Sequence, residues 1–285
     1  MTRLQGVAHA KLNLTLDVLG TRPDGYHNLK MVMQEIELGD SLSLTLETGN
    51  AWTVTGNSGE IPLDESNLAI KAAKLFFAAS GISCEGLSLH LDKVTPVCAG
   101  MGGGSADGAA ILRILQTHYG APLSEETLFS LAEQTGADVP FALFGGTALA
   151  EEKGQVLTRL PAVPRCSIVL CKPPFPVSTP ELFRAIDREP IVQRPNTDAM
   201  ICALENQDLP GIAAQLCNVF EPVVTRMHPE LKDIRQTLLD CGALGAGMTG
   251  SGPTMFGLFS QESQARNAEA ALKSRYRDTF LTRPV

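Results

Sequence analysis

The sequence has no arrangement of cysteines or histidines that would form a disulfide framework or a structural metal site. Its seven cysteines are an odd number without a CxxC pair, and its five histidines include no HExxH motif. A chain of 285 residues is also long enough to bury its own core without such staples. These absences exclude the small disulfide-stapled secreted proteins and favour a reduced, cytoplasmic protein without structural zinc.

The sequence also lacks a membrane span, a targeting segment and a basic stripe. No apolar run reaches the length of about 18 residues that a spanning helix needs. The start, MTRLQGVAHAKLNL, has neither a secretory apolar region nor an Arg/Ser-rich transit pattern. The formal net charge of −8 argues against nucleic acid or an anionic membrane as the main partner. We therefore expect a cytoplasmic protein that acts on small molecules, and the sequence carries no signal for its oligomeric state.

What is present is a mixture of strand and helix patterns. Residues 8–18 alternate strictly, with six apolar residues on one face and Lys11 and Asn13 together on the other. Further strands are expected at 41–47, 51–56, 86–92, 167–172 and 254–259, and helices at 67–80, 105–118, 125–135, 180–186 and 263–276. Runs of strands and helices in each half predict a two-domain α+β protein.

Several helix ends carry capping signals. Ser66, Ser124 and Thr179 precede helical patterns and are the predicted N-caps, Thr179 being followed by Pro180. Gly81 follows the first of these helices and is its predicted C-terminal glycine.

Residues 99–110, AGMGGGSADGAA, place four glycines directly before an alanine-rich helix. Glycine inside an element costs roughly 0.5–1 kcal/mol relative to alanine, so a run this dense predicts that something approaches the backbone closely. A strand, a glycine loop and a helix N-terminus together present unpaired N–H groups to an anion, which favours a phosphate site. The alternative, a tight turn with close packing, explains one or two glycines. Because no Lys-Ser/Thr pair follows, the stretch is not a Walker A loop.

The surrounding segment PVCAGMGGGSADGAA resembles the phosphate loop of the GHMP kinases, the family of galactokinase, homoserine kinase, mevalonate kinase and phosphomevalonate kinase. Two further segments are similar to motifs of that family and follow in the expected order, AKLNLTLDVLGTRPDGYHNLKMVMQ and GAGMTGSGPTMFGLF. The first of them, with GADVPFALFGGTALAEEKG, resembles the branch of the family that acts on 4-diphosphocytidyl-2-C-methyl-D-erythritol. Met101, Cys98 and Ala106 depart from the usual pattern, and none of them removes a charged group.

The resemblance implies a fold and a reaction. The fold is an N-terminal domain like the second domain of ribosomal protein S5, over 1–155, that binds ATP and carries catalysis. A ferredoxin-like C-terminal domain over 156–285 binds the substrate. The reaction is phosphoryl transfer from ATP, with Mg²⁺, to the 2-hydroxyl of the cytidylated methylerythritol, which belongs to isoprenoid precursor biosynthesis by the non-mevalonate pathway.

The resemblance also implies residue roles. Asp138 of GADVPF would act as general base or orient the hydroxyl, with Lys11 beside it. The ATP-binding residues would be Pro96, Ala99, Gly100, Met101, Gly102, Gly103, Gly104, Ser105 and Ala106. The substrate-binding residues would be Asn13, Tyr26, His27, Thr179, Phe183, Gly250, Ser251 and Gly252. Among these, Tyr26 and Phe183 would enclose the cytosine and His27 would hydrogen-bond it.

Structural explanations stand beside these roles. Lys11 alone could be a solvated lysine, Asp138 a turn or capping residue, and Phe183 a core side chain. Ser105 could cap its helix or contact phosphate or magnesium, and the metal ligands are not identified. Two other functions remain open, a GHMP kinase for another small alcohol such as mevalonate or homoserine, and a nucleotide-binding sensor without catalysis.

Overall fold

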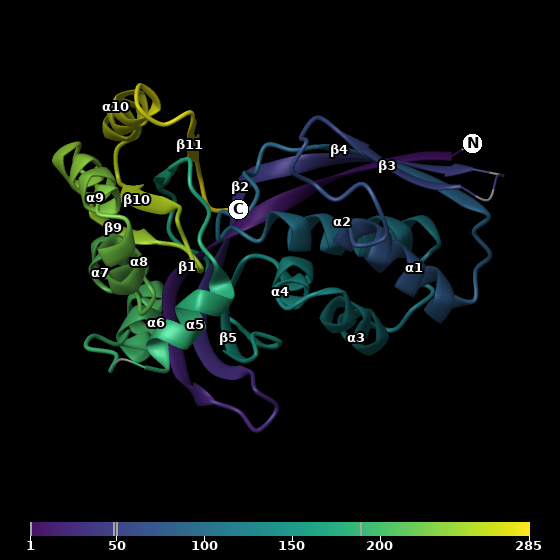
Figure 1. Ribbon diagram of the computed structural model, residues 1–285, viewed down its shortest axis with the longest axis horizontal. Helices are drawn as coiled ribbons and strands as arrows, with labels where there is room; N and C mark the ends of the chain where they lie inside the picture. Colours follow the sequence, from purple (N-terminus) through teal and green to yellow (C-terminus); the bar gives the residue numbers. More distant parts are fainter. Residues whose placement is uncertain (1, 48, 50, 189) are drawn as a thin grey trace. The chain divides into compact units, whose positions relative to one another are not determined.

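The computed structural model describes residues 2–47, 49, 51–188 and 190–285 (Figure 1). The chain forms two compact units, each assembled from separate segments. The first, unit 1, contains the residues up to Ala10, Gly39–Val97 and Gly102–Gly145, and unit 2 contains Lys11–Leu38, Cys98–Met101 and Gly146–Val285. The expected domains were continuous stretches of chain, and their boundary at residue 155 stays a prediction.

In unit 1, helices cover a sheet. The strands are β3 (Trp52–Gly56), β4 (Gly86–Asp92) and this unit's parts of β2 (His27–Glu47) and β1 (Thr2–Thr21), in the order β3-β4-β2-β1. Strand β4 runs antiparallel to β2, with Ser41 opposite Asp92, and β3 runs parallel to β4. The helices are α1 (Leu68–Ser80), α2 (Gly103–His118), α3 (Glu125–Thr135) and α4 (Val139–Phe144).

The core of unit 1 lies between this sheet and the helices α1 and α2. Leu44 and Leu87 come from the sheet, Phe76 from α1 and Ile111 from α2, and all four are fully buried. Burying such side chains contributes about 1.5–3 kcal/mol each relative to leaving them exposed. This packing fixes the axis of α2, the helix that follows the glycine stretch.

Two of the three helix caps predicted in unit 1 agree with the structure. Ser124 accepts a hydrogen bond from the Thr127 amide at 3.2 Å, as predicted. Gly81 has the left-handed conformation, with φ 68°, that ends α1. The prediction of Ser66 as N-cap of α1 is wrong: Asn67 is the cap, and its side chain accepts from the Ala69 amide. The hydroxyl of Ser66 donates instead to Asp64.

In unit 2, a four-stranded antiparallel sheet has the order β11-β7-β10-β9. Its strands are β7 (Ser167–Lys172), β9 (Gly245–Met248), β10 (Met255–Phe259) and β11 (Asp278–Thr282). Helices separate β7 from β9, β9 and β10 form a hairpin, and α10 (Glu262–Lys273) connects β10 to β11. This order and these crossovers are those of a ferredoxin-like domain, which confirms the expected C-terminal fold.

The remaining elements of unit 2 surround this sheet and the rest of β1 and β2. Strand β5 (Thr147–Glu152) pairs with β2, and β6 (Val156–Arg159) pairs with β5. The short strand β8 (Cys217–Asn218) runs parallel to β1, with Thr15 opposite Cys217. The helices are α5 (Thr179–Ile186), α6 (Thr197–Glu205), α7 (Leu209–Ala214), α8 (Glu221–Met227) and α9 (Glu230–Asp240).

Strand β1 is buried on both faces over much of its length. The six alternating apolar residues that were expected to share a face, Ala8, Ala10, Leu12, Leu14, Leu16 and Val18, are all at most 4% exposed. On the other face Lys11, Asn13 and Thr15 are buried as well. A buried lysine and asparagine need hydrogen-bond partners, and this polar face carries the candidate site.

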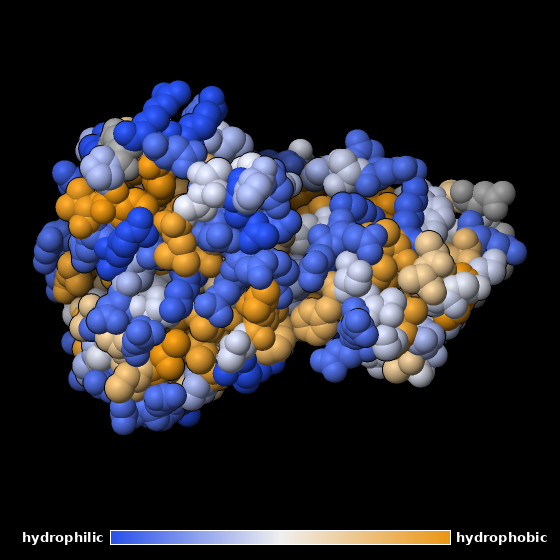
Figure 2. All heavy atoms as spheres, turned by 90° about the horizontal axis from the view of Figure 1, so that it is seen from below, coloured by the Kyte–Doolittle hydropathy of each residue, from blue (hydrophilic) through white to orange (hydrophobic). Residues whose placement is uncertain are grey.

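The helices of the described residues do not combine the length and hydropathy that a membrane span requires. No helix there is both long and apolar enough to cross a bilayer. Figure 2 shows hydrophilic and apolar residues intermingled on the face it displays.

Candidate active site

Lys11 and Asn13 project from the same face of β1 and contact each other. The Lys11 ammonium donates to Oδ1 of Asn13 at 2.6 Å, and both side chains are buried. The backbone amide of Lys11 donates to the Met101 carbonyl at 3.0 Å, which ties the end of residues 98–101 to the same strand. The predicted alternation therefore places the two side chains correctly, and the alternative of a solvated Lys11 does not describe this buried residue.

Asn13 holds the C-terminal glycine loop, which we define as residues 249–252. Its Oδ1 accepts a hydrogen bond from the Gly250 backbone amide at 3.0 Å, and the backbone amide of Asn13 donates to Thr249 Oγ1 at 3.0 Å. Its Nδ2 lies 3.4 Å from the sulfur of Met31. In this structure Asn13 thus organises the loop, and its predicted contact with substrate stays a prediction.

The glycines of the two loops in unit 2 make a close backbone contact. Gly100 (φ 72°), Gly250 (φ 58°) and Gly252 (φ 79°) all have left-handed conformations. A Cβ on Gly250 would lie 2.5 Å from the Gly100 carbonyl oxygen, and one on Gly100 would lie 3.0 Å from the Gly252 nitrogen. The packing of residues 98–101 against residues 249–252 therefore excludes a side chain at Gly100 and at Gly250.

The glycines at the start of α2, in unit 1, have different surroundings. Gly102 is the N-cap, with φ 66°, and the Ala106 amide makes the first turn's bond to its carbonyl. A Cβ on Gly103 would lie 3.0 Å from a methyl carbon of Thr95. A Cβ on Gly104 would meet only a Leu68 methyl carbon, at 3.8 Å, and Gly104 is exposed. The protein's own packing thus explains Gly103 but not Gly104.

The other residues predicted to bind ATP differ in accessibility. Ala99, Met101 and Ala106 have buried side chains, so only their backbone could meet a ligand, and Pro96 is half-buried. Ser105 lies within the first turn of α2 and is not its cap, because the helix begins two residues earlier. Its hydroxyl makes no hydrogen bond to the residues that the structure describes, so it is open to a ligand.

A buried ionic cluster of unit 1 lies beside this helix start, and sequence reasoning missed it. The Lys93 ammonium donates to Asp40 at 2.5 Å and to Asp107 at 2.7 Å. Asp40 also accepts from the amides of Val94 and Thr95. Burial raises the pKa of Asp107 to about 7; Lys93 opposes this rise and the neighbouring Asp40 carboxylate adds to it. The cluster anchors the segment between β4 and the glycine stretch to α2.

Asp138 precedes α4 in the chain and is half-buried. It occupies the N-cap position but makes no side-chain hydrogen bond to the helix. Its side chain therefore does not cap α4, although the residue lies in the turn that precedes this helix, as the alternative explanation also allowed.

The residues proposed to hold cytosine form a group in unit 2. The His27 ring stacks on Phe183 with centroids 4.5 Å apart, and its Nε2 lies 2.8 Å from Asp187 Oδ1. Tyr26 is 62% exposed and lies under the Lys153 ammonium, 5.0 Å from the ring centroid. His27 rather than Tyr26 thus stacks on Phe183 here, and the roles of all three in binding a base stay predictions.

Thr179 is the first residue of α5 rather than its N-cap, so the capping prediction is wrong. Ser178 occupies the cap position, and the Thr179 hydroxyl donates to the Ser251 hydroxyl at 2.8 Å. Phe183 is half-buried, whereas Leu182 and Ile186 form the buried face of this helix. The structure therefore brings Thr179 to the C-terminal glycine loop and leaves Phe183 partly exposed, with its ring edge-on to the buried Phe220.

The sequence is similar to known kinases over nearly its whole length. Residues 67–146 match the GHMP kinases N terminal domain, and residues 200–278 match the GHMP kinases C terminal family. The chain is 45% identical over 280 residues to a 4-diphosphocytidyl-2-C-methyl-D-erythritol kinase of Pelotomaculum thermopropionicum, covering 98% of this chain and 97% of that protein. It is 42% identical to the kinase of that name from Caldicellulosiruptor saccharolyticus, over 96% and 94% of the two chains.

Solved structures show the same likeness. A crystal structure of 4-(cytidine 5'-diphospho)-2C-methyl-D-erythritol kinase matches with a TM-score of 0.84 and 34% identity, covering 99% of each chain. A homoserine kinase from Cytophaga hutchinsonii matches with a TM-score of 0.78 at 19% identity, over 100% of this chain and 95% of that one, which shows a shared fold.

Proposed function

The chain belongs to the GHMP kinase family, and we propose that it transfers a phosphoryl group from ATP to the 2-hydroxyl of 4-diphosphocytidyl-2-C-methyl-D-erythritol. The products would be the 2-phosphate and ADP, in the non-mevalonate route to isoprenoid precursors. The observation that carries this proposal is the 45% identity over 98% of this chain to a protein named for that substrate.

The glycine segments support ATP as the phosphoryl donor. Free amides at the start of α2 and the positive end of its dipole suit a triphosphate, and the exposed Gly104 leaves room for it. Mg²⁺ would enter with the nucleotide, held mainly by phosphate oxygens, and would neutralise charge on the transferred group. The Ser105 hydroxyl fits such an ion because it is an oxygen without a partner in the described part of the chain. No group of three acidic, histidine or cysteine side chains there forms a metal site of its own.

Two side chains would act directly on the reacting groups. We assign Asp138 to accept or orient the proton of the attacking hydroxyl. We assign the buried Lys11 ammonium to stabilise negative charge on the transferred phosphoryl group. Asn13 fixes the orientation of that ammonium by accepting its hydrogen bond.

The nucleotide handle of the substrate would provide binding energy at a distance from the chemistry. Stacking of a base on an aromatic ring contributes about 1–3 kcal/mol. Tyr26 is exposed and available for such stacking, and His27 and Phe183 lie together in the same unit. The contact of His27 Nε2 with Asp187 Oδ1, at 2.8 Å, would leave Nδ1 to meet the base.

A phosphorus NMR time course tests the proposed function. The protein is incubated with ATP, Mg²⁺ and the cytidylated substrate, and with mevalonate or homoserine in parallel tubes. We expect a new phosphomonoester signal only with the cytidylated substrate. A signal with another alcohol would keep the kinase activity and reject the substrate. If folded protein that binds ATP gave no signal in any tube, a sensor would replace the kinase.

A further inference from the structure

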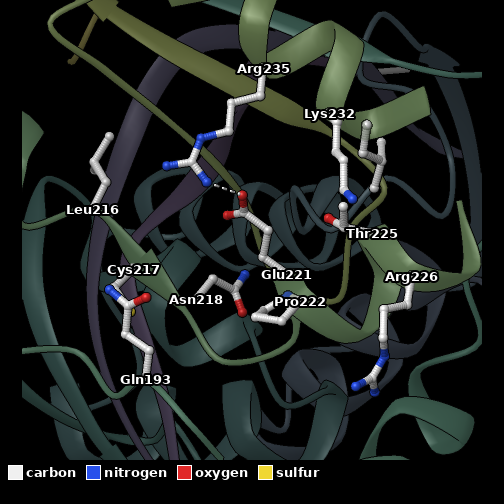
Figure 3. Close-up of a pocket in the computed structure, with 11 residues that line it drawn as sticks. Gln193, Leu216, Cys217, Asn218, Glu221, Pro222, Thr225, Arg226, Lys232 and Arg235 are labelled. Carbon is white, nitrogen blue, oxygen red and sulfur yellow. Dashed lines mark hydrogen bonds and ion pairs between the residues drawn. The ribbon is translucent and has the colours of Figure 1, made fainter. Parts of the chain in front are cut away.

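A cavity of about 390 Å³ lies in unit 2 beside α8, α9 and β8 (Figure 3). None of its lining residues was predicted to belong to the active site. Three basic side chains line it, Arg226, Lys232 and Arg235, together with the Thr225 hydroxyl. This local excess of positive charge contrasts with the net charge of −8 of the whole chain.

The basic side chains of α9 share one face of that helix. Lys232 and Arg235 are three residues apart, which places them side by side. In Figure 3 both extend toward α8, where Arg235 meets Glu221, while Arg226 extends away from them. Glu221 is the single carboxylate of the lining, and three cations outnumber it.

Both oxygens of Glu221 are already engaged. Oε1 accepts from Arg235 Nη1 at 2.8 Å, and Oε2 accepts from the Met248 amide at 3.0 Å. A guanidinium has five N–H groups, and within the described residues Arg235 donates only through Nη1. Lys232 is exposed, and its ammonium has no hydrogen bond or ion pair there. The cavity therefore offers donors from two cations to an incoming anion.

Part of the wall is apolar, beside the uncharged polar side chains of Gln193, Asn218 and Thr225. Leu216, Pro222 and Leu231 line the cavity, and Leu231 is buried. An inorganic anion alone would leave this wall in contact with water. A ligand with a short apolar group would cover it and gain about 0.8 kcal/mol for each buried methylene.

We propose that this cavity binds a small phosphorylated molecule, a phosphate or diphosphate ester with a short apolar group. Its phosphate would accept hydrogen bonds from Lys232 and Arg235, and its apolar group would lie on Leu216, Pro222 and Leu231. This is a second site, separate from the residues assigned to ATP and to the alcohol substrate.

The second site is linked to the C-terminal glycine loop by hydrogen bonds. Glu221 holds the Met248 amide. Asn218, which also lines the cavity, donates through Nδ2 to the carbonyls of Met248 and Gly250, each at 2.8 Å. A ligand that draws Arg235 away from Glu221 would therefore alter the support of residues 248–250.

Binding is measured by phosphorus NMR titration with hexyl phosphate and with inorganic phosphate. A saturating non-hydrolysable ATP analogue and Mg²⁺ keep the phosphate loop filled. Lys232→Gln is the test variant, since an exposed lysine without described partners can be replaced without disturbing the fold. Lys273→Gln on α10 is the matched control, because it removes the same charge from an exposed position outside the cavity.

We expect one hexyl phosphate per chain, bound at least about tenfold more tightly than inorganic phosphate. Lys232→Gln should weaken this binding about tenfold or more, and Lys273→Gln should change it less than twofold. Absence of binding, or equal binding in Lys232→Gln and the parent protein, would overturn the site. Equal affinity for the two probes would overturn the apolar part of the proposal.

The link to the loop rests on the proposed function and needs a separate measurement. Saturating hexyl phosphate should change the KM for the alcohol substrate in the parent protein but not in Lys232→Gln. An unchanged KM with the site filled would contradict the link. Because the titration requires no turnover, failure of the kinase assay and failure of the second site give different results.

Discussion

Gly100 and Gly250 meet so closely that neither position has room for a side chain. A Cβ on Gly250 would lie 2.5 Å from the Gly100 carbonyl oxygen, well inside contact distance. The sequence predicts that Gly100 binds ATP and that Gly250 binds the substrate. At these two positions the bare backbone serves the contact between the loops.

Replacing Gly250 by alanine should therefore damage both stability and activity. Alanine at φ 58° costs about 1 kcal/mol or more from backbone strain, and the clash with Gly100 adds to it. We expect a lower melting temperature and at least a tenfold loss of kcat/KM. Thermal unfolding monitored by circular dichroism and steady-state kinetics check this. A variant with parental stability and kinetics would show that the loops do not require this contact.

Gly104→Ala is the contrasting variant, because a Cβ fits there without a clash. Alanine favours a helix by about 1 kcal/mol over glycine, so the variant should be as stable as the parent protein or more so. If the ATP phosphates approach this residue as proposed, the KM for ATP should rise severalfold all the same. Calorimetric unfolding and ATP titrations separate the two effects. An unchanged KM would place the phosphates elsewhere.

Asp138→Asn should remove the proposed base while keeping the residue's shape. We expect kcat to fall by about 10² or more, the scale for losing a general base, with folding and ATP binding unchanged. The measurement is kcat beside the Kd of an ATP analogue. Near-normal turnover would remove Asp138 from the mechanism.

Tyr26→Ala should raise the KM for the cytidylated substrate by about tenfold or more, since stacking contributes about 1–3 kcal/mol. The ring is 62% exposed, so its removal should leave stability unchanged. Lys153→Ala is a suitable control, because it removes the cation that lies over the ring and retains the ring itself. A KM equal to that of the parent would contradict the stacking role.

The buried cluster around Lys93 should make stability depend on pH. The folded-state pKa of Asp107 is about 7, above its ordinary 3.8, so the folded protein binds more protons than the unfolded chain between these values. The contribution of Asp107 to stability is therefore greatest at low pH and is lost as pH rises toward 7. Lys93 contacts Asp107 directly, and the Asp40 carboxylate acts on it from the other side of their shared partner Lys93.

Asp107→Asn removes this titration and keeps Asp40 as partner of Lys93. The parent protein loses stability from Asp107 as pH rises, and the variant does not. The unfolding free energy of the variant minus that of the parent should therefore increase by on the order of 1 to 3 kcal/mol from pH 5 to pH 8. Urea unfolding at both pH values measures this gain. Asp40→Asn is the contrast, because it replaces the carboxylate oxygen that accepts from the Lys93 ammonium by an amide group and should destabilise the protein at both pH values. A pH-independent difference for Asp107→Asn would contradict the raised pKa.

Features that depend on neighbouring residues, such as strand alternation and helix caps, could largely be predicted from the sequence. The alternation in β1 placed Lys11 beside Asn13, and the cap at Ser124 was correct. Ser66 and Thr179 were plausible caps with equally good neighbours, Asn67 and Ser178, and the sequence offered no means to choose between them. The motif resemblance supplied the family and the fold.

Long-range contacts could not be read from the sequence. The Lys93 cluster joins residues 40, 93 and 107, and no spacing rule connects them. Asn13 was chosen for contact with substrate, yet its partners Thr249 and Gly250 are 236 and 237 residues away. Their pairing depends on the tertiary fold.

The wide separation of Asn13 from Thr249 has a consequence for how the protein is made. At about 5–20 residues per second, Asn13 leaves the site of synthesis roughly 10 to 50 seconds before Thr249 does. Unit 1 is complete once Gly145 has been synthesised, long before that loop. A nascent chain can thus acquire one packed core while its catalytic apparatus has not yet assembled. Cleavage or premature termination before Thr249 would leave a chain that contains all of unit 1 but lacks the loop that Asn13 holds.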